Sequence, residues 1–295
     1  MNWNESLQAF KSYLLLERGL SENTLKNYVF DVQKLIAYLE KNSIIFGPTK
    51  VQSKHLLRFI YDAAKEVKPS SQSRLLSGLR SFFDFLIQEG VRDNNPLALV
   101  EPPKTGSTLP MILSVGEVEK LIASALGSKP VQIRNTCILE ILYACGLRVS
   151  ELVNLRCSDL FFEEGLIKVI GKGDQERFVP IGRIGQEAVK DYLSIRKEGK
   201  KGHSDVLFLN NRGTKLTRNM IFIIVRKAAE LAGIEKKIGP HSLRHSFATH
   251  LVENGADISS VQQMLGHSSI TTTERYLHMS KKHLQQTIHQ FHPRS

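Results

Sequence analysis

The chain contains little cysteine and no long apolar run. Its three cysteines, Cys137, Cys145 and Cys157, form no C-x-x-C pair among 295 residues, which argues against a zinc ribbon or a disulfide framework. No stretch reaches the roughly 20 apolar residues that a membrane-spanning helix needs. Residues 1–5 are polar and acidic, unlike a secretory signal peptide. We therefore expect a cytoplasmic protein with no membrane partner.

The sequence also lacks a cluster of carboxylates suited to magnesium. His241 and His245 are four residues apart and could bind zinc from one helix face, with His250 or His267 as a third ligand. The glutamate of the H-E-x-x-H protease motif is missing, however, because Ser242 occupies its position. We predict that the protein uses no metal and no cofactor.

The net charge is strongly positive and unevenly distributed. Lys and Arg total 40 against 29 Asp and Glu, which gives a formal net charge of +11. The part after Thr105 contains 26 basic and 18 acidic residues and so carries +8. This surplus favours DNA or RNA as a partner, since lysine and arginine displace counterions from nucleic acid. Charge alone does not separate a nucleic-acid-binding protein from other basic proteins.

Residues 1–101 show the periodicity of helices and no strand pattern. Four amphipathic stretches are separated by helix-ending residues such as Gly19 and Gly90, and Ser21 is a predicted N-cap. Short links between such helices predict a compact four-helix domain. The apolar stripes that would form its core are Leu7, Phe10 and Leu14, then Leu25, Tyr28, Val32, Leu35 and Leu39, then Leu56 and Ile60, and finally Leu75, Leu79, Phe82 and Leu86.

Residues 102–110 read Pro-Pro-Lys-Thr-Gly-Ser-Thr-Leu-Pro, a composition typical of an exposed linker. We place the boundary there, which leaves domains at 1–101 and 111–295. The second domain is predicted to be mostly helical with a small β-hairpin, so the fold class is mainly α. Residues 206–209 are a further strand candidate. The polar tail at 280–295 has few apolar residues and therefore little to bury against its own chain.

The clearest β pattern covers residues 166–181. Two β-branched runs flank Gly171-Lys172-Gly173-Asp174, a turn composition that predicts a hairpin with Lys172 near its tip. Most lysines at hairpin tips are simply solvated, so Lys172 by itself is a weak functional signal.

Arg148 is expected to be partly buried. It follows Gly146, which ends an apolar helix, and its neighbours Leu147 and Val149 are core-type residues. A buried guanidinium needs a partner, and Glu151, three residues on, could supply the carboxylate. A purely structural ion pair between these two residues is the alternative to a functional role for Arg148.

The segment from His241 to Tyr276 concentrates groups that can bind and attack phosphate. His241 and Arg244 are three residues apart and share one face of a helix. His267 follows Gly266, a natural helix stop. Arginine gives a bidentate donor fork, histidine donates hydrogen bonds or moves a proton, and tyrosine can be a nucleophile. Taken alone, Tyr276 would be read as a half-buried aromatic residue.

In this order the residues resemble the signature of the tyrosine recombinase (phage integrase) family. That signature is an Arg, a Lys in a hairpin, a His-x-x-Arg, a later His or Trp, and a Tyr nucleophile. The resemblance covers nearly the whole chain and is strongest for the Xer branch, the bacterial chromosome-dimer resolvases. The catalytic residues that it implies are Arg148, Lys172, His241, Arg244, His267 and Tyr276.

The resemblance also implies how each part works. The first domain would be the core-binding (SAM-like) domain that clamps DNA, and the second would be catalytic. The two arginines and His267 would hold the scissile phosphate, and His241 would act as a general base or a further donor. Tyr276 would attack phosphorus to give a 3′-phosphotyrosine, while Lys172 protonates the 5′-oxygen that leaves.

The partners implied by the resemblance are double-stranded DNA at a dif-like site, a second Xer recombinase in a heterotetramer, and an FtsK-type DNA translocase. The terminal helix of each subunit would dock on its neighbour. The process would be resolution of chromosome dimers during cell division. Two alternatives stay open: a type IB topoisomerase, which shares this residue set, and a catalytically silent DNA-binding protein.

Overall fold

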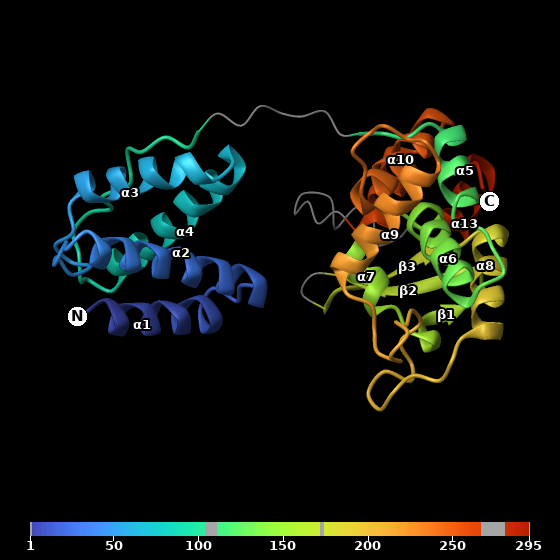
Figure 1. Ribbon diagram of the computed structural model, residues 1–295, viewed down its shortest axis with the longest axis horizontal. Helices are drawn as coiled ribbons and strands as arrows, with labels where there is room; N and C mark the ends of the chain where they lie inside the picture. The colour runs from blue at the N-terminus through green and yellow to red at the C-terminus, as the bar shows by residue number, and fades with distance from the viewer. Residues whose placement is uncertain (1, 104–110, 172–173, 267–280, 295) are drawn as a thin grey trace. The chain divides into compact units, whose positions relative to one another are not determined.

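The computed structural model describes residues 2–103, 111–171, 174–266 and 281–294, and it divides into two compact units, Met1–Thr108 and Leu109–Ser295 (Figure 1). Both units are largely helical, and a small antiparallel sheet lies in the second. The prediction of a mainly α chain with one β-hairpin is confirmed. In the part of the chain that is described, no helix is both long and apolar enough to cross a bilayer.

The first unit is a bundle of α1 (Trp3–Leu16), α2 (Glu22–Lys41), α3 (Ser53–Glu66) and α4 (Pro69–Gln88). The predicted N-cap at Ser21 is present, since its side chain accepts a hydrogen bond from the Thr24 amide. An ion pair joins α2 to α4, with the partly exposed Arg74 guanidinium 2.6 and 2.8 Å from the two oxygens of the buried Asp31 carboxylate. Each expected apolar stripe contributes to one contiguous core.

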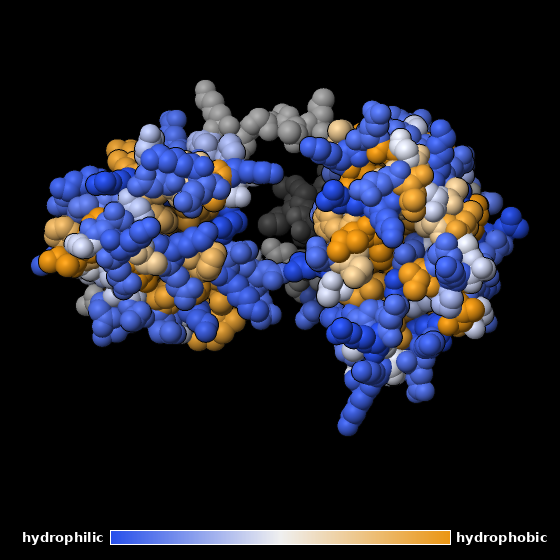
Figure 2. All heavy atoms as spheres, viewed as in Figure 1, coloured by the Kyte–Doolittle hydropathy of each residue, from blue (hydrophilic) through white to orange (hydrophobic). Residues whose placement is uncertain are grey.

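The second unit is built around a long apolar helix, α6 (Pro130–Ala144), which packs closely against α8 (Arg183–Ile195) and α10 (Pro240–Glu253). The other α-helices among the described residues of this unit are α5 (Val115–Ala123), α7 (Val149–Asn154), α9 (Arg218–Leu231), α11 (Ile258–Leu265) and α13 (Lys281–Phe291). On the face drawn in Figure 2, hydrophilic residues cover most of each unit and apolar residues appear in separate patches.

The sheet has the order β1-β2-β3, with β1 at Leu160–Phe161, β2 at Leu166–Ile170 and β3 at Glu176–Pro180. β2 and β3 form the predicted hairpin, in which Val169 lies opposite Arg177 and Ile167 opposite Val179. The short β1 was not predicted. A two-residue strand gives too little alternation to detect in a sequence.

The prediction of a strand at residues 206–209 is wrong. Val206 and Leu209 form only isolated bridges, and the 206–209 backbone does not enter the sheet. The reason is the Arg196 guanidinium, which donates to the carbonyl oxygens of Val206 and Leu207 at 2.6 and 3.0 Å. These acceptors are therefore taken by a side chain instead of a neighbouring strand.

The expectation that the tail has little to bury against its own chain is also wrong. Leu284 and Ile288 are buried on α13, which packs against β3, α10 and α11. Beyond the helix, the Arg294 guanidinium lies 2.8 Å from the carboxylate of Glu140 on α6. His292 lies between the rings of Tyr143 and Phe247. The tail is thus held by the buried apolar residues of α13 and also by polar contacts, which its low apolar content does not reveal.

Candidate active site

Arg148 is placed by a sharp turn between α6 and α7. Gly146 has φ +56, and a Cβ at this position would lie 2.4 Å from the ring of Phe247. Only glycine combines that left-handed backbone with so close a contact. The turn brings Arg148 to the N-cap of α7, where its amide donates to Glu151 at 2.8 Å.

His241 and Arg244 lie in the first turns of α10, as predicted. The helix begins at Pro240, where proline favours a helix start because its missing N–H would have no intrahelical partner. Arg244 is buried, whereas His241 is exposed. The charges of Arg244 and Arg148 both reach His241, and Arg148 and Arg244 both contact Glu151. The three predicted residues therefore lie near one another, although Arg148 precedes α7 and the other two belong to α10.

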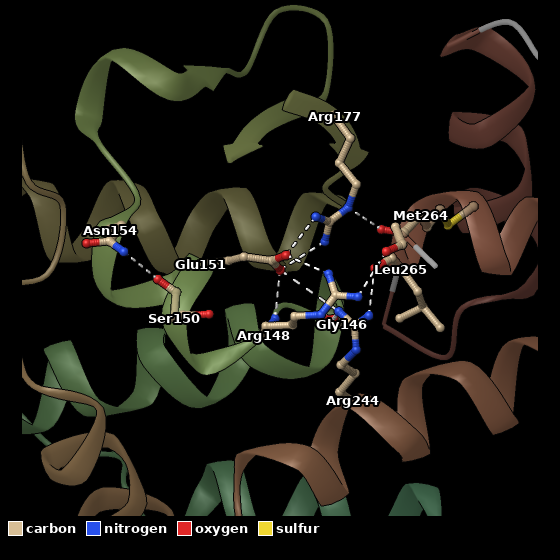
Figure 3. A network of polar contacts seen from close by, with 10 residues as sticks. Gly146, Arg148, Ser150, Glu151, Asn154, Arg177, Arg244, Met264 and Leu265 are labelled. Carbon is tan, nitrogen blue, oxygen red and sulfur yellow. Dashed lines mark hydrogen bonds and ion pairs between the residues drawn. The ribbon is translucent and has the colours of Figure 1, made fainter. Parts of the chain in front are cut away.

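One carboxylate stands at the centre of the site. Glu151 is almost fully buried, with a side-chain exposure of 1%, and faces three guanidiniums (Figure 3). Nη1 of Arg148 lies 2.9 Å from Oε1, and Nη1 of Arg244 lies 3.9 Å from Oε2. Nη1 and Nη2 of Arg177 lie 2.7 and 2.9 Å from Oε1 and Oε2. The expected Arg148–Glu151 pair is thus present, as part of a larger network.

The same three guanidiniums bind the last turn of α11. Arg177 Nε donates to the Met264 carbonyl at 2.8 Å, Arg244 Nη2 to Leu265 at 2.6 Å, and Arg148 Nη2 to Gly266 at 2.9 Å. The terminal carbonyls of a helix have no intrahelical donor and carry partial negative charge, so cations stabilise them. Gly266 caps the helix with φ +63, and His267 follows it in the sequence.

The pKa values reflect this environment. Burial alone would raise the pKa of Glu151, but hydrogen bonds from Arg177 and Arg148 and the charge of Arg177 lower it below its ordinary value. Burial, assisted by the charge of Arg148, lowers the pKa of Arg244 to about 10. Although the residue as a whole is exposed, partial burial of its imidazole and the charges of Arg244, His245 and Arg148 lower the pKa of His241. At neutral pH these shifts leave Glu151 and Arg244 ionised and favour the neutral imidazole of His241.

Arg148 and Arg244 retain donors for a ligand. A guanidinium has five N–H groups. The side chain of Arg148 donates to Glu151 and Gly266, and that of Arg244 donates to the carbonyls of Gly146 and Leu265. The unused N–H groups of both residues can bind the oxygens of a phosphodiester. Neutral His241 beside them can accept a proton.

The structure therefore brings together Arg148, His241 and Arg244. The other three residues of the expected set, Lys172, His267 and Tyr276, lie outside the described residues, so their placement stays a prediction. Among the residues that are described, no three His, Cys, Asp or Glu side chains form a group that could hold a metal. His250, one candidate ligand, is buried with Nδ1 2.8 Å from the Tyr143 hydroxyl.

Arg177 is the residue that our sequence reasoning missed. Strand alternation could have found it, because side chains two residues apart in a strand share a face. Arg177 and Val179 therefore lie on the same face of β3, and Val179 is fully buried. An arginine on the inner face of a strand needs a buried acidic partner.

Two family models match the chain. The model described as "Phage integrase family" covers residues 112–283. The model described as "Phage integrase, N-terminal SAM-like domain" covers residues 7–90. Each model falls on one of the two units.

Individual proteins are similar over nearly the full length. The tyrosine recombinase XerD of Listeria innocua is 42% identical, covering 99% of this chain and 100% of the relative. A crystal structure of XerA recombinase shares 32% identity with a TM-score of 0.51, covering 100% of both chains. A post-cleavage complex of the XerH site-specific recombinase with palindromic difH substrate shares 26% identity and a TM-score of 0.71. It covers 91% of this chain and 80% of that one.

Proposed function

Because the chain belongs to the phage integrase family and is a tyrosine site-specific recombinase, we propose that it cuts and rejoins DNA through a 3′-phosphotyrosine intermediate. The Tyr276 oxygen attacks the scissile phosphorus, the new O–P bond forms, and the bond from phosphorus to the 5′-oxygen breaks. His241 accepts the tyrosine proton, and Lys172 donates a proton to the 5′-oxygen. Religation reverses these steps, so the phosphodiester energy is conserved in the covalent intermediate.

The main observation in support of this proposal is that Arg148 and Arg244 bind the same end of α11. Both donate to adjacent carbonyls of one helix end, Gly266 and Leu265, and both keep further N–H groups. Negative charge accumulates on the non-bridging phosphate oxygens in the transition state. Fixed guanidiniums at that position stabilise it more than the ground state, because they need no reorganisation during the reaction.

The biological role rests on the relatives. Their name, XerD, supports a substrate like a dif site and a second Xer recombinase as partner in a tetramer. We also propose that an FtsK-type translocase is a partner, that chromosome dimers are the substrate, and that the protein acts in the cytoplasm. The N-terminal unit would clamp the DNA, and residues 111–295 would perform the chemistry.

The test is adduct formation on a nicked duplex that carries a candidate dif sequence. A nick a few nucleotides 3′ to the scissile phosphate lets the short 5′-hydroxyl fragment dissociate, so the phosphotyrosine is trapped. We expect a covalent band with the native chain and with Tyr61→Phe, an exposed tyrosine of α3, and none with Tyr276→Phe. Binding without any adduct would identify a silent binder, and relaxation of supercoiled DNA without site-specific products would identify a topoisomerase.

A further inference from the structure

Arg177 is engaged by protein acceptors through all three of its side-chain nitrogens. Two of them bind the two oxygens of Glu151 and the third binds the Met264 carbonyl. The side chain is only 13% exposed. A bidentate guanidinium–carboxylate pair that is shielded from water is both strong and fixed in direction.

This pair completes the hydrogen bonding of Glu151. Oε1 accepts from Arg148 Nη1 and Arg177 Nη1, and Oε2 accepts from the Arg148 amide and Arg177 Nη2. A carboxylate has about four acceptor positions, and all four are occupied. Without Arg177, two of these positions would be empty and the negative charge of Glu151 would face Arg148 and Arg244 alone. Arg244, whose Nη1 is now 3.9 Å from Oε2, would then be drawn toward the carboxylate, and Arg148 would be held on it more tightly.

Arg177 also sets the position of the last turn of α11. Its side chain packs against Gly266, where an added Cβ would lie 3.0 Å from Arg177 Cδ. Because Arg148 and Arg244 bind the next two carbonyls of the same turn, a shift of this turn would move both guanidiniums. Arg177 therefore connects the hairpin strand β3 to α7, which follows Arg148, and to the end of α11, which Arg148 and Arg244 both bind.

We propose that Arg177 is a positioning residue for DNA strand cleavage: it pairs with Glu151 and holds the end of α11, so that Glu151 does not draw Arg148 and Arg244 away from the orientation that binds the scissile phosphate. The inference rests on the proposed function. Arg177 acts through its neighbours, and its own nitrogens are committed to protein oxygens.

The test compares Arg177→Met and Arg177→Lys with the native chain in single-turnover adduct formation at saturating DNA. Misplacement of a reacting group by about 1 Å can cost a factor of about 100 in rate, so we expect a loss of that order for Arg177→Met. DNA affinity should change by less than about threefold, since the phosphate contacts that dominate binding are elsewhere. Lysine, which keeps the charge, should recover part of the lost rate.

A double variant of Glu151 and Arg177 distinguishes a loss of rate caused by misplaced arginines from one caused by unfolding. If Arg177 acts by neutralising Glu151, then Glu151→Gln combined with Arg177→Met should cleave no more slowly than Arg177→Met alone, because the uncompensated carboxylate is gone. Additive losses in the double variant would overturn the proposal. So would native cleavage rates in a folded Arg177→Met protein, or a defect confined to DNA affinity.

The matched control is Arg183→Met. Arg183 is an arginine of α8 with 83% side-chain exposure and only a 3.8 Å contact to Glu187, so its replacement should leave the rate unchanged. An absence of adduct with the native chain would instead count against the proposed function, which keeps the two failures distinct.

Discussion

Replacement of Glu151 by glutamine tests whether the carboxylate is essential to the second unit. The substitution keeps the size of the side chain but removes the charge that three guanidiniums share. It also points an amide NH₂ at N–H donors that need an acceptor. Removing one partner of a buried ion pair typically costs about 3–5 kcal/mol, since the remaining charges are left uncompensated. We expect a loss of that size in the free energy of unfolding.

The assay can exploit the single tryptophan of the chain. Trp3 lies in α1, with its indole nitrogen 3.0 Å from the Phe46 carbonyl, so its fluorescence reports on the first unit alone. Helicity followed by circular dichroism reports on both units. In urea, Glu151→Gln should shift the helicity transition of the second unit and leave the Trp3 fluorescence transition where it is.

Glu176→Gln is the matched control. Glu176 has 57% side-chain exposure and lies 3.4 Å from Lys168, so its loss should cost no more than about 1 kcal/mol. If Glu151→Gln unfolds at the same urea concentration as this control, the three arginines do not depend on the carboxylate, and the reasoning about the network fails.

Four further predictions follow from other contacts. Burial lowers the pKa of His292 to about 4, whereas in the unfolded chain this histidine is protonated below about pH 6.5. The free energy of unfolding should therefore fall by up to about 3 kcal/mol between pH 6.5 and 4. In urea titrations, His292→Gln should make the free energy of unfolding depend less on pH in this range. Gly266→Ala places a Cβ at φ +63 against Arg177 and should cost about 1–2 kcal/mol and slow adduct formation, unlike Gly116→Ala, whose Cβ meets nothing within 4 Å. Arg74→Met removes the bidentate partner of the buried Asp31 carboxylate. Because Arg74 is itself 39% exposed, the free energy of unfolding that Trp3 reports should fall by about 1–3 kcal/mol, less than for a fully buried pair, and by more than in Asp31→Asn. The logarithm of the DNA association constant should fall steeply and linearly with the logarithm of the salt concentration, as phosphate contacts require. An association constant that does not change with salt would contradict binding through phosphate contacts.

Local rules in the sequence were enough for most of the secondary structure. The apolar stripes of the first unit, its N-cap at Ser21 and the paired β-branched runs of the hairpin each depend on residues a few positions apart. The errors came where a distant side chain intervened. Arg196 takes the carbonyls of the expected strand, and Glu140, far earlier in the chain, supplies the anchor of the tail. No local pattern contains such pairings.

For the site, the sequence supplied the residue types and the structure supplied their partners. Glu151 was identified as a partner for Arg148 because it is one helical turn away. Arg177 is 26 positions from Glu151, and only the hairpin register brings it there. Three arginines donate to three successive carbonyls at the end of α11. This arrangement depends on tertiary packing, which the spacing of residues in the sequence does not show.

The docked tail constrains how subunits could exchange their terminal helices. Glu140 has a side-chain exposure of 2% and pairs with Arg294. A buried carboxylate stripped of its partner costs several kcal/mol, so the tail cannot leave this position without a substitute. If the terminal helix docks on a neighbour, as the resemblance implies, the incoming tail must place its own arginine on Glu140. The tail then makes the same contacts whether it docks on its own subunit or on a neighbour. The equilibrium between these two states is set by protein concentration and by the geometry of the assembly rather than by any new interaction.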